Sequence, residues 1–149
     1  MLPVMWMRAL LLLVLSSGPA LAWDVTLGPV CVLRHETPGL GVELTYDPAL
    51  PRYTITLTRP GGWPARRIFG LRFEGPRGNL ITTDRQRIDG PGLTVEDRGF
   101  GNVLDGMQGN LQMVAVMGDG ALVDIAAVPL DGAAPAVQLF RDCPPQAGV

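Results

Sequence analysis

The segment Arg52-Tyr53-Thr54-Ile55-Thr56-Leu57-Thr58 decides the fold class. Its apolar side chains alternate with threonines, and a period of two places Tyr53, Ile55 and Leu57 on one face of an extended chain. This pattern is typical of an antiparallel strand with one face in the core and the other in solvent. Similar short runs, separated by Gly, Pro and Asp turns, predict strands at 25–34 (interrupted at Gly28-Pro29), 42–46, 68–74, 79–83 and 93–96.

The next part of the sequence predicts a β-hairpin. Residues 111–117 and 121–128 flank Gly118-Asp119-Gly120, which is a three-residue hairpin signal. Both runs are apolar on both faces, so we expect both strands to lie centrally in a sheet. Residues 102–108, which precede the hairpin, fit either a short helix or an irregular connection.

The C-terminal region predicts a short helix. After Asp131, the apolar residues Ala133, Ala136, Val137 and Phe140 recur at helical spacing, and Pro135 falls in the first turn, where proline is tolerated. Short strands with one late helix are typical of a packed pair of sheets. We therefore predict a mainly β chain: a single-domain antiparallel β-sandwich or flattened barrel with one short C-terminal helix.

Residues 1–22 have the pattern of an export signal. Arg8 supplies a positive charge, residues 9–15 form an apolar core, and Ala20-Leu21-Ala22 fits the small-x-small cleavage rule. The apolar run is far shorter than the roughly 20 residues that a membrane-spanning helix needs. We expect cleavage after Ala22, a single β-rich domain at 23–149, no stable membrane span after processing, and a periplasmic or secreted protein.

The two cysteines predict one disulfide. Cys31 lies near the start of the mature chain and Cys143 near its end. In an oxidising compartment an even pair of cysteines is typical of a structural disulfide. A redox or metal pair would need neighbouring thiols or imidazoles, and neither cysteine has them in the sequence.

The composition excludes several classes of enzyme. All 12 basic residues are arginine, the serines are Ser16 and Ser17 in the predicted signal, and His35 is the single histidine. The mature chain therefore lacks a serine nucleophile, a Schiff-base lysine, a P-loop lysine and a histidine-rich metal site. Five acids remain as candidates for carboxylate chemistry, but no spacing selects two of them. These acids are Asp84, Asp89, Glu96, Asp97 and Asp105. We assign no catalytic residue, metal or cofactor.

Arginine is concentrated in the middle of the sequence. Residues 59–87 contain seven of the 12 arginines against two acids, whereas residues 88–149 contain two arginines and eight acids. Four of these arginines form a candidate binding face for an acidic protein or envelope component: Arg66, Arg67, Arg72 and Arg85. The alternative is that they pair with the acidic C-terminal third. Nucleic acid is not an expected partner, because the net charge is negative and aromatic residues are few.

Several segments resemble small exported bacterial proteins of unknown function. They are Leu93-Thr94-Val95-Glu96-Asp97-Arg98-Gly99-Phe100-Gly101 continuing to residue 106, together with 58–60, 72–75, 82–85 and 128–137 running on to Phe140 and Cys143. Some such proteins carry the name of an excinuclease, a DNA-repair helicase, but a helicase needs a phosphate loop with a lysine, and this chain has no lysine. The chain ending more loosely resembles the invasion-associated locus B proteins, exported β-sandwich modules linked to envelope and host-interaction roles. This chain lacks their internal cysteine pairs, so the second resemblance implies architecture only.

Two functional hypotheses follow. The first is a non-enzymatic periplasmic binding or envelope-accessory module that is closed by a disulfide. The second is a small carboxylate-dependent hydrolase, in which Glu or Asp acts as general acid. Two acidic side chains meeting in one concave pocket would favour the hydrolase, and an apolar or arginine-lined surface would favour the binding module.

Overall fold

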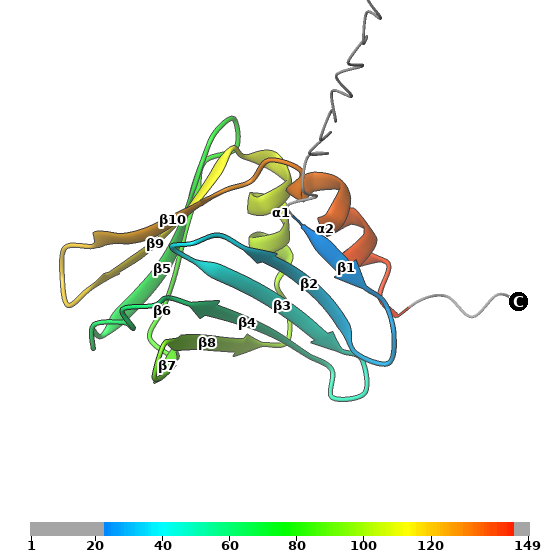
Figure 1. Cartoon of the computed structure of the whole chain (residues 1–149), viewed down its shortest axis with the longest axis horizontal. Coiled ribbons are helices and arrows are strands. Elements are labelled where there is room, and N and C mark those ends of the chain that lie inside the picture. Colours follow the sequence, from blue (N-terminus) through cyan, green and yellow to red (C-terminus); the bar gives the residue numbers. More distant parts are fainter. Residues whose placement is uncertain (1–22, 145–149) are drawn as a thin grey trace, which may run out of the picture.

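Two antiparallel sheets and two helices make up residues 23–144, which are the residues that the computed structural model describes (Figure 1). The predicted export signal at 1–22 lies outside the described residues. Sheet A has the strand order β1-β2-β3-β4-β8-β7, and sheet B has the order β10-β9-β5-β6. The strands are β1 (Asp24–Thr26), β2 (Cys31–Glu36), β3 (Gly41–Asp47), β4 (Arg52–Thr58), β5 (Ile68–Glu74), β6 (Asn79–Thr83), β7 (Arg87–Asp89), β8 (Gly92–Asp97), β9 (Gln112–Gly118) and β10 (Val123–Pro129). The prediction of a mainly β, sandwich-like fold is confirmed, and the sheets do not close into a barrel.

The inner face of sheet A is built by the alternation seen in β4. Ile55 and Leu57 are 1% and 0% exposed, and Tyr53 is half-buried on the same face. Leu44 of β3 and Val95 of β8 lie opposite Ile55 on either side, so apolar residues form continuous rows across the strands. The threonines between them point to the outer face.

Sheet B supplies the other half of the core. Its central strands, β5 and β9, pair in antiparallel register, with Phe69 opposite Met117 and Phe73 opposite Met113. All four of these side chains are at most 2% exposed and face the inner side of sheet A. Core packing between the two inner faces is therefore continuous.

The two helices, α1 (Gly101–Gly109) and α2 (Ala133–Arg141), join the sheets at one end (Figure 1). Helix α1 contacts β5, β6 and β9 of sheet B, α2 contacts β1 and β2 of sheet A, and the helices contact each other. The segment left open at 102–108 is thus helical, and the predicted C-terminal helix is confirmed. The close approach of α1 to sheet B requires Gly106, because a Cβ atom there would lie 2.5 Å from the Phe73 ring.

Two expectations about the strands need correction. The hairpin around Gly118-Asp119-Gly120 forms, but only β9 is central; β10 is an edge strand, and Val123 is 61% exposed. The strand was expected to be central because its sequence is apolar on both faces, but among the described strands it pairs with β9 alone, and a register shift between Asp124 and Ala126 interrupts that pairing. Strand β7 was not predicted, because three residues are too few to show a period. None of the helices within residues 23–144 is long and apolar enough to cross a membrane.

Candidate functional site

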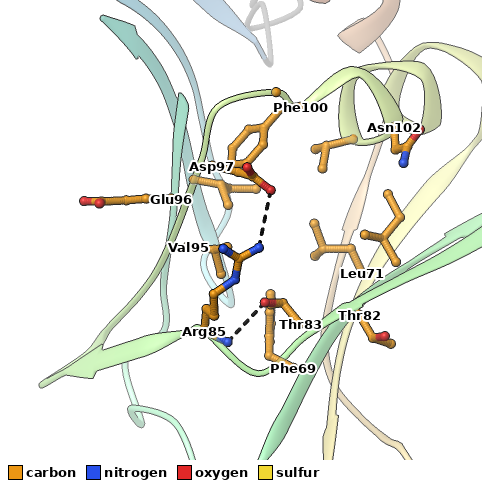
Figure 2. A pocket seen from close by; sticks show the side chains of 14 residues that line it. Phe69, Leu71, Thr82, Thr83, Arg85, Val95, Glu96, Asp97, Phe100 and Asn102 are labelled. Atoms are coloured by element: carbon orange, nitrogen blue, oxygen red, sulfur yellow. Dashed lines mark hydrogen bonds and ion pairs between the residues drawn. The ribbon is translucent and has the colours of Figure 1, made fainter. Parts of the chain in front are cut away.

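A cleft of about 150 Å³ opens between the two sheets, beside β6 and β8 (Figure 2). We call it the inter-sheet cleft. Side chains from both sheets and from α1 surround it, so it lies where core packing between the sheets ends. Its lining residues are Ile55, Phe69, Leu71, Ile81, Thr82, Thr83, Arg85, Val95, Glu96, Asp97, Gly99, Phe100, Asn102 and Val103.

The deeper part of the cleft is apolar. Ile55, Phe69 and Leu71 are core residues with 1%, 2% and 4% exposure, and Phe100 and Val103 approach from the start of α1. These strand residues are the inward-facing positions of β4 and β5, so the alternation that builds the core also builds this wall. A space of about 150 Å³ is large enough for a benzene ring.

Arg85 and Asp97 lie at the polar edge of the cleft. The Arg85 side chain extends from the link between β6 and β7 toward Asp97 at the end of β8 (Figure 2). Its Nη2 lies 3.8 Å from Asp97 Oδ2, which is an ion pair but too long for a hydrogen bond. The Arg85 side chain is also 73% exposed, so its guanidinium keeps most of its donors for another anion. The backbone N–H of Arg85 donates to Thr83 Oγ1 at 3.1 Å, which holds the link in place.

Glu96 and Asp97 do not form a catalytic pair at this cleft. They are successive residues on β8, and successive strand side chains point to opposite faces. Glu96 points away from the cleft, where Arg87 donates to it at 2.7 Å and Arg52 lies 3.7 Å away (Figure 2). Of the five acids selected from the sequence, the other three do not line this cleft. The geometry therefore gives the carboxylate-dependent hydrolase no support here.

The candidate binding face divides into two groups. Gln86, the residue after Arg85, donates from Nε2 to the carbonyl oxygens of Arg66 and Arg67 at 3.0 and 3.2 Å. The segments that carry Arg66, Arg67 and Arg85 are therefore in contact. Asp119 in the β9–β10 turn accepts a hydrogen bond from the Arg67 backbone N–H at 2.8 Å and lies 3.9 Å from Arg66 Nε. Of the four predicted arginines, Arg85 alone lines the inter-sheet cleft.

Arg72 belongs to a separate group on the outer face of sheet B. It donates two hydrogen bonds to Asp124 of β10, at 2.8 and 2.9 Å, and two to Glu74 of its own strand, at 3.1 and 2.9 Å. These hydrogen bonds, to Asp124 first and to Glu74 second, raise the pKa of the Arg72 guanidinium, and the bond from Arg72 lowers the pKa of the Asp124 carboxyl. Arg72 thus reaches Asp124 across β9, whose Val114 lies opposite Arg72 and is 3% exposed although it is not part of the core between the sheets.

Arg72 and Arg85 are not cross-strand neighbours, although both belong to the candidate binding face. The turn between β5 and β6 places Phe73 opposite Asn79, and this register puts Leu80 opposite Arg72. Strand β6 ends at Thr83, so Arg85 lies beyond the paired region. The two arginines therefore do not repel each other as direct neighbours in the sheet.

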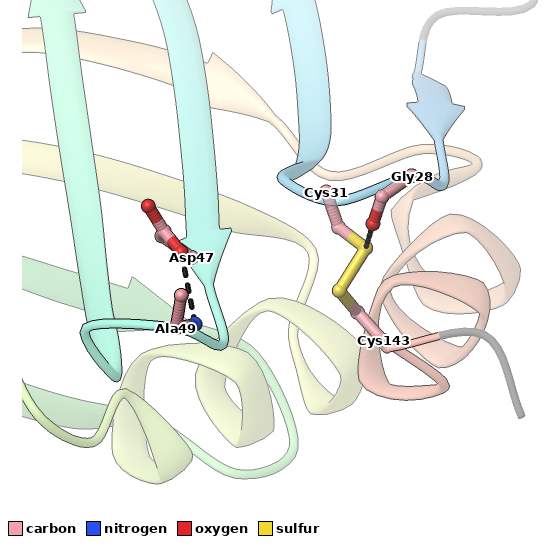
Figure 3. The surroundings of a disulfide bond; sticks show 5 residues. All are labelled: Gly28, Cys31, Asp47, Ala49 and Cys143. Carbon is pink, nitrogen blue, oxygen red and sulfur yellow. Dashed lines mark hydrogen bonds between the residues drawn. A yellow bond between two sulfur atoms is a disulfide. The ribbon is translucent and has the colours of Figure 1, made fainter.

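Cys31 and Cys143 form the predicted disulfide (Figure 3). Cys31 is the first residue of β2 and is completely buried, and Cys143 follows α2. Their Cα atoms are 6.2 Å apart across a sequence separation of 112 residues. The bond therefore fastens the end of α2 to sheet A, next to the contacts that α2 makes with β1 and β2.

Comparison with known proteins supports the fold. No protein-family model matches the chain, and no curated protein matches it. Among solved structures, the chain is similar to the crystal structure of invasion-associated protein B from Bartonella henselae, with a TM-score of 0.57 and 15% sequence identity. The match covers 80% of this chain and 92% of that chain. The looser of the two resemblances seen in the sequence is thus supported at the level of architecture, and the chain has the fold of that invasion-associated protein.

Proposed function

We propose that this chain is an exported, non-enzymatic binding module whose inter-sheet cleft takes a small apolar group with an anion beside it. The observation that carries the proposal is the pairing of an apolar wall with Arg85 at the cleft edge. Binding sites are commonly apolar hollows with a few polar groups that fix orientation. Because the volume is about 150 Å³, the cleft suits one ring or one branched side chain and not a drug-sized ligand.

Asp97 sets the charge preference of the site. Its carboxylate lies 3.8 Å from the Arg85 guanidinium and would repel an incoming anion that shares the same arginine. Removal of the Asp97 charge should therefore strengthen the binding of an anionic ligand, and removal of the Arg85 charge should weaken it. Opposite effects from two adjacent charges are not expected of a purely structural ion pair.

Export is part of the proposal. The pattern of residues 1–22 supports cleavage after Ala22, and the Cys31–Cys143 disulfide is typical of proteins outside the reducing cytoplasm. Trp23, the first residue of the proposed mature domain at 23–149, is 6% exposed and packs on His35 with ring centroids 4.6 Å apart. Mass measurement of the protein purified from the native host should find a chain beginning at Trp23, and a chain that retains Met1 would contradict export by this signal.

The ligand test uses two molecules of similar size, benzoate and benzyl alcohol, of which benzoate alone is charged. In a two-dimensional NMR titration of the mature protein, both should shift the amide signals of Ile81, Val95 and Val103, because these residues line the cleft. Replacing Arg85 with Gln should lower the affinity for benzoate about two- to fivefold, which is the effect of an exposed charge pair. The affinity for benzyl alcohol should stay unchanged. Asp97→Asn should raise the affinity for benzoate.

The matched control for the arginine change is Arg34→Gln. Arg34 is also exposed, but it pairs with Glu43 on the outer face of sheet A and does not line the cleft. This control should leave the affinity for benzoate unchanged. Shifts that do not saturate, or that spare the cleft amides, would contradict the proposed function.

A further inference from the structure

Strand β8 has an unpaired edge beside the inter-sheet cleft. On one side β8 pairs with β4 over its whole length, from Gly92 to Asp97. On the other side β7 pairs with β8 only as far as Thr94, where Arg87 is the partner. No strand within residues 23–144 lies beside Val95–Asp97 on that side, so this short edge can pair with another chain.

The link between β6 and β7 explains why this edge is free. A continuation of β7 past Arg87 would place Gln86 and Arg85 beside the end of β8. Instead, Gln86 turns toward the segment of Arg66 and Arg67 and donates to their carbonyl oxygens. The link starts at the end of β6. This strand is the edge of sheet B and lines the opposite side of the cleft. Two strand edges thus flank one apolar hollow.

Three features coincide at this place. The hollow fits one apolar side chain, Arg85 offers donors to one carboxylate, and the edge Val95–Asp97 offers backbone hydrogen bonds to about three extended residues. The last residues of a protein chain carry all three matching groups when the final residue is apolar. Recognition by strand addition and capture of a terminal carboxylate are both established ways of binding peptides.

We propose that the inter-sheet cleft binds the C-terminal end of a partner protein that finishes in an apolar residue such as Leu or Phe. The partner's last residues extend β8 at Val95–Asp97, the final side chain enters the cleft, and the terminal carboxylate binds Arg85. This inference rests on the proposed function, because it needs the same apolar hollow and the same arginine. It adds the class of partner and the role of the β8 edge.

The test compares four ligands by isothermal titration calorimetry with the mature protein. They are N-acetyl-leucine, the peptide acetyl-Ala-Ala-Ala-Leu with a free carboxylate, the same peptide as a C-terminal amide, and the same peptide with N-methylated Ala residues. The free-acid peptide should bind about tenfold more tightly than N-acetyl-leucine, because it adds backbone hydrogen bonds. N-methylation should remove that gain, since it removes the N–H donors and leaves the leucine side chain unchanged.

The amide tests the carboxylate. It should bind about two- to fivefold more weakly than the acid, and Arg85→Gln should remove the difference between the two. In the NMR spectrum, the free-acid peptide should slow hydrogen exchange at Val95, Glu96 or Asp97, whichever amides face the free edge, whereas N-acetyl-leucine should not.

The outcomes separate this inference from the proposed function. If N-acetyl-leucine and the free-acid peptide bind equally, or if N-methylation has no effect, the strand-pairing inference is wrong and the ligand cleft stands. If neither N-acetyl-leucine nor benzoate binds at the cleft, both proposals are wrong. If the amide binds as well as the acid, the partner is not recognised by its C-terminus.

Discussion

Replacement of Cys143 with Ala tests what holds α2 against sheet A. Cys31 is completely buried in the core, whereas Cys143 lies just beyond α2 and is partly exposed. A change at Cys143 therefore removes the bond with less loss of packing than a change at Cys31. In the variant, α2 should still pack on the core through Val137 and Phe140, whose side chains are 0% and 1% exposed.

The size of the effect follows from the length of the closed loop. The disulfide joins residues separated by 112 positions. For a loop of this length, the lost entropy of the unfolded chain corresponds to roughly 5 kcal/mol at 298 K. Small proteins typically have a total free energy of unfolding of about 5–15 kcal/mol. The bond is therefore expected to supply a large fraction of the stability.

The assay is urea unfolding followed by tryptophan fluorescence, with and without a reductant. Oxidised wild type should be more stable than Cys143→Ala by about 3–5 kcal/mol. Reductant should bring the wild type close to the variant, and it should leave the variant unchanged. A difference below about 1 kcal/mol between the two oxidised proteins would refute the reasoning. It would show that packing of α2, and not the bond, determines stability at this end.

Further outcomes are expected at three positions away from the cleft. Asn110→Ala should lower the free energy of unfolding by about 1–3 kcal/mol, because the buried amide binds backbone groups of Arg77 and Gly106; exposed Asn79→Ala is the control. Gly106→Ala should lower the melting temperature through its clash with Phe73, whereas an alanine at Gly101, with open space around it, should not. Asp124→Asn should destabilise at neutral pH but less and less below about pH 3.8 when urea unfolding is repeated across pH. The reason is that the lowered folded-state pKa of Asp124 stabilises only while its carboxylate is ionised.

The sequence predicted those elements whose pattern lies within a few neighbouring residues. The alternation at 52–58 predicted β4 and its inward residues, and the helical spacing after Asp131 predicted α2. The cysteine pair was predictable for a different reason: with two cysteines, one intramolecular disulfide is possible. Each of these predictions depends on residues that are close in sequence or on the number of cysteines.

The inter-sheet cleft was not predictable in the same way. Its walls come from β4, β5, β6, β8 and α1, so its existence depends on how two sheets are spaced and where side chains fail to fill the gap. Arg85 was selected from the sequence as part of a charged face, but its position beside Asp97 depends on where β6 ends and where β7 begins. A short strand such as β7 leaves no pattern that could have marked this point.

Strand order explains why several arginines of the candidate binding face lie beside acidic residues. Because β9 lies next to β5 and β10 lies on the far side of β9, the hairpin brings Asp119 and Asp124 from the acidic third near Arg66, Arg67 and Arg72. The expected pairing with acidic residues therefore describes Arg72, Arg66 and Arg67, whereas a binding role remains a prediction and falls on Arg85. Arg72 donates four hydrogen bonds to two carboxylates and so links β5 to β10 on the outer face of sheet B.

Arg85 differs because it lies in the link between β6 and β7, away from the acidic residues of the β9–β10 hairpin. Its acidic neighbour is Asp97, at the end of β8, and the separation of 3.8 Å leaves the guanidinium weakly held. The same departure of the link frees the edge of β8 at Val95–Asp97. One local event, the early end of pairing between β7 and β8, therefore produces both the available charge and the available strand edge, and it does so beside an apolar hollow. These three properties match the three groups of the proposed ligand: an apolar side chain, a carboxylate and an extended backbone.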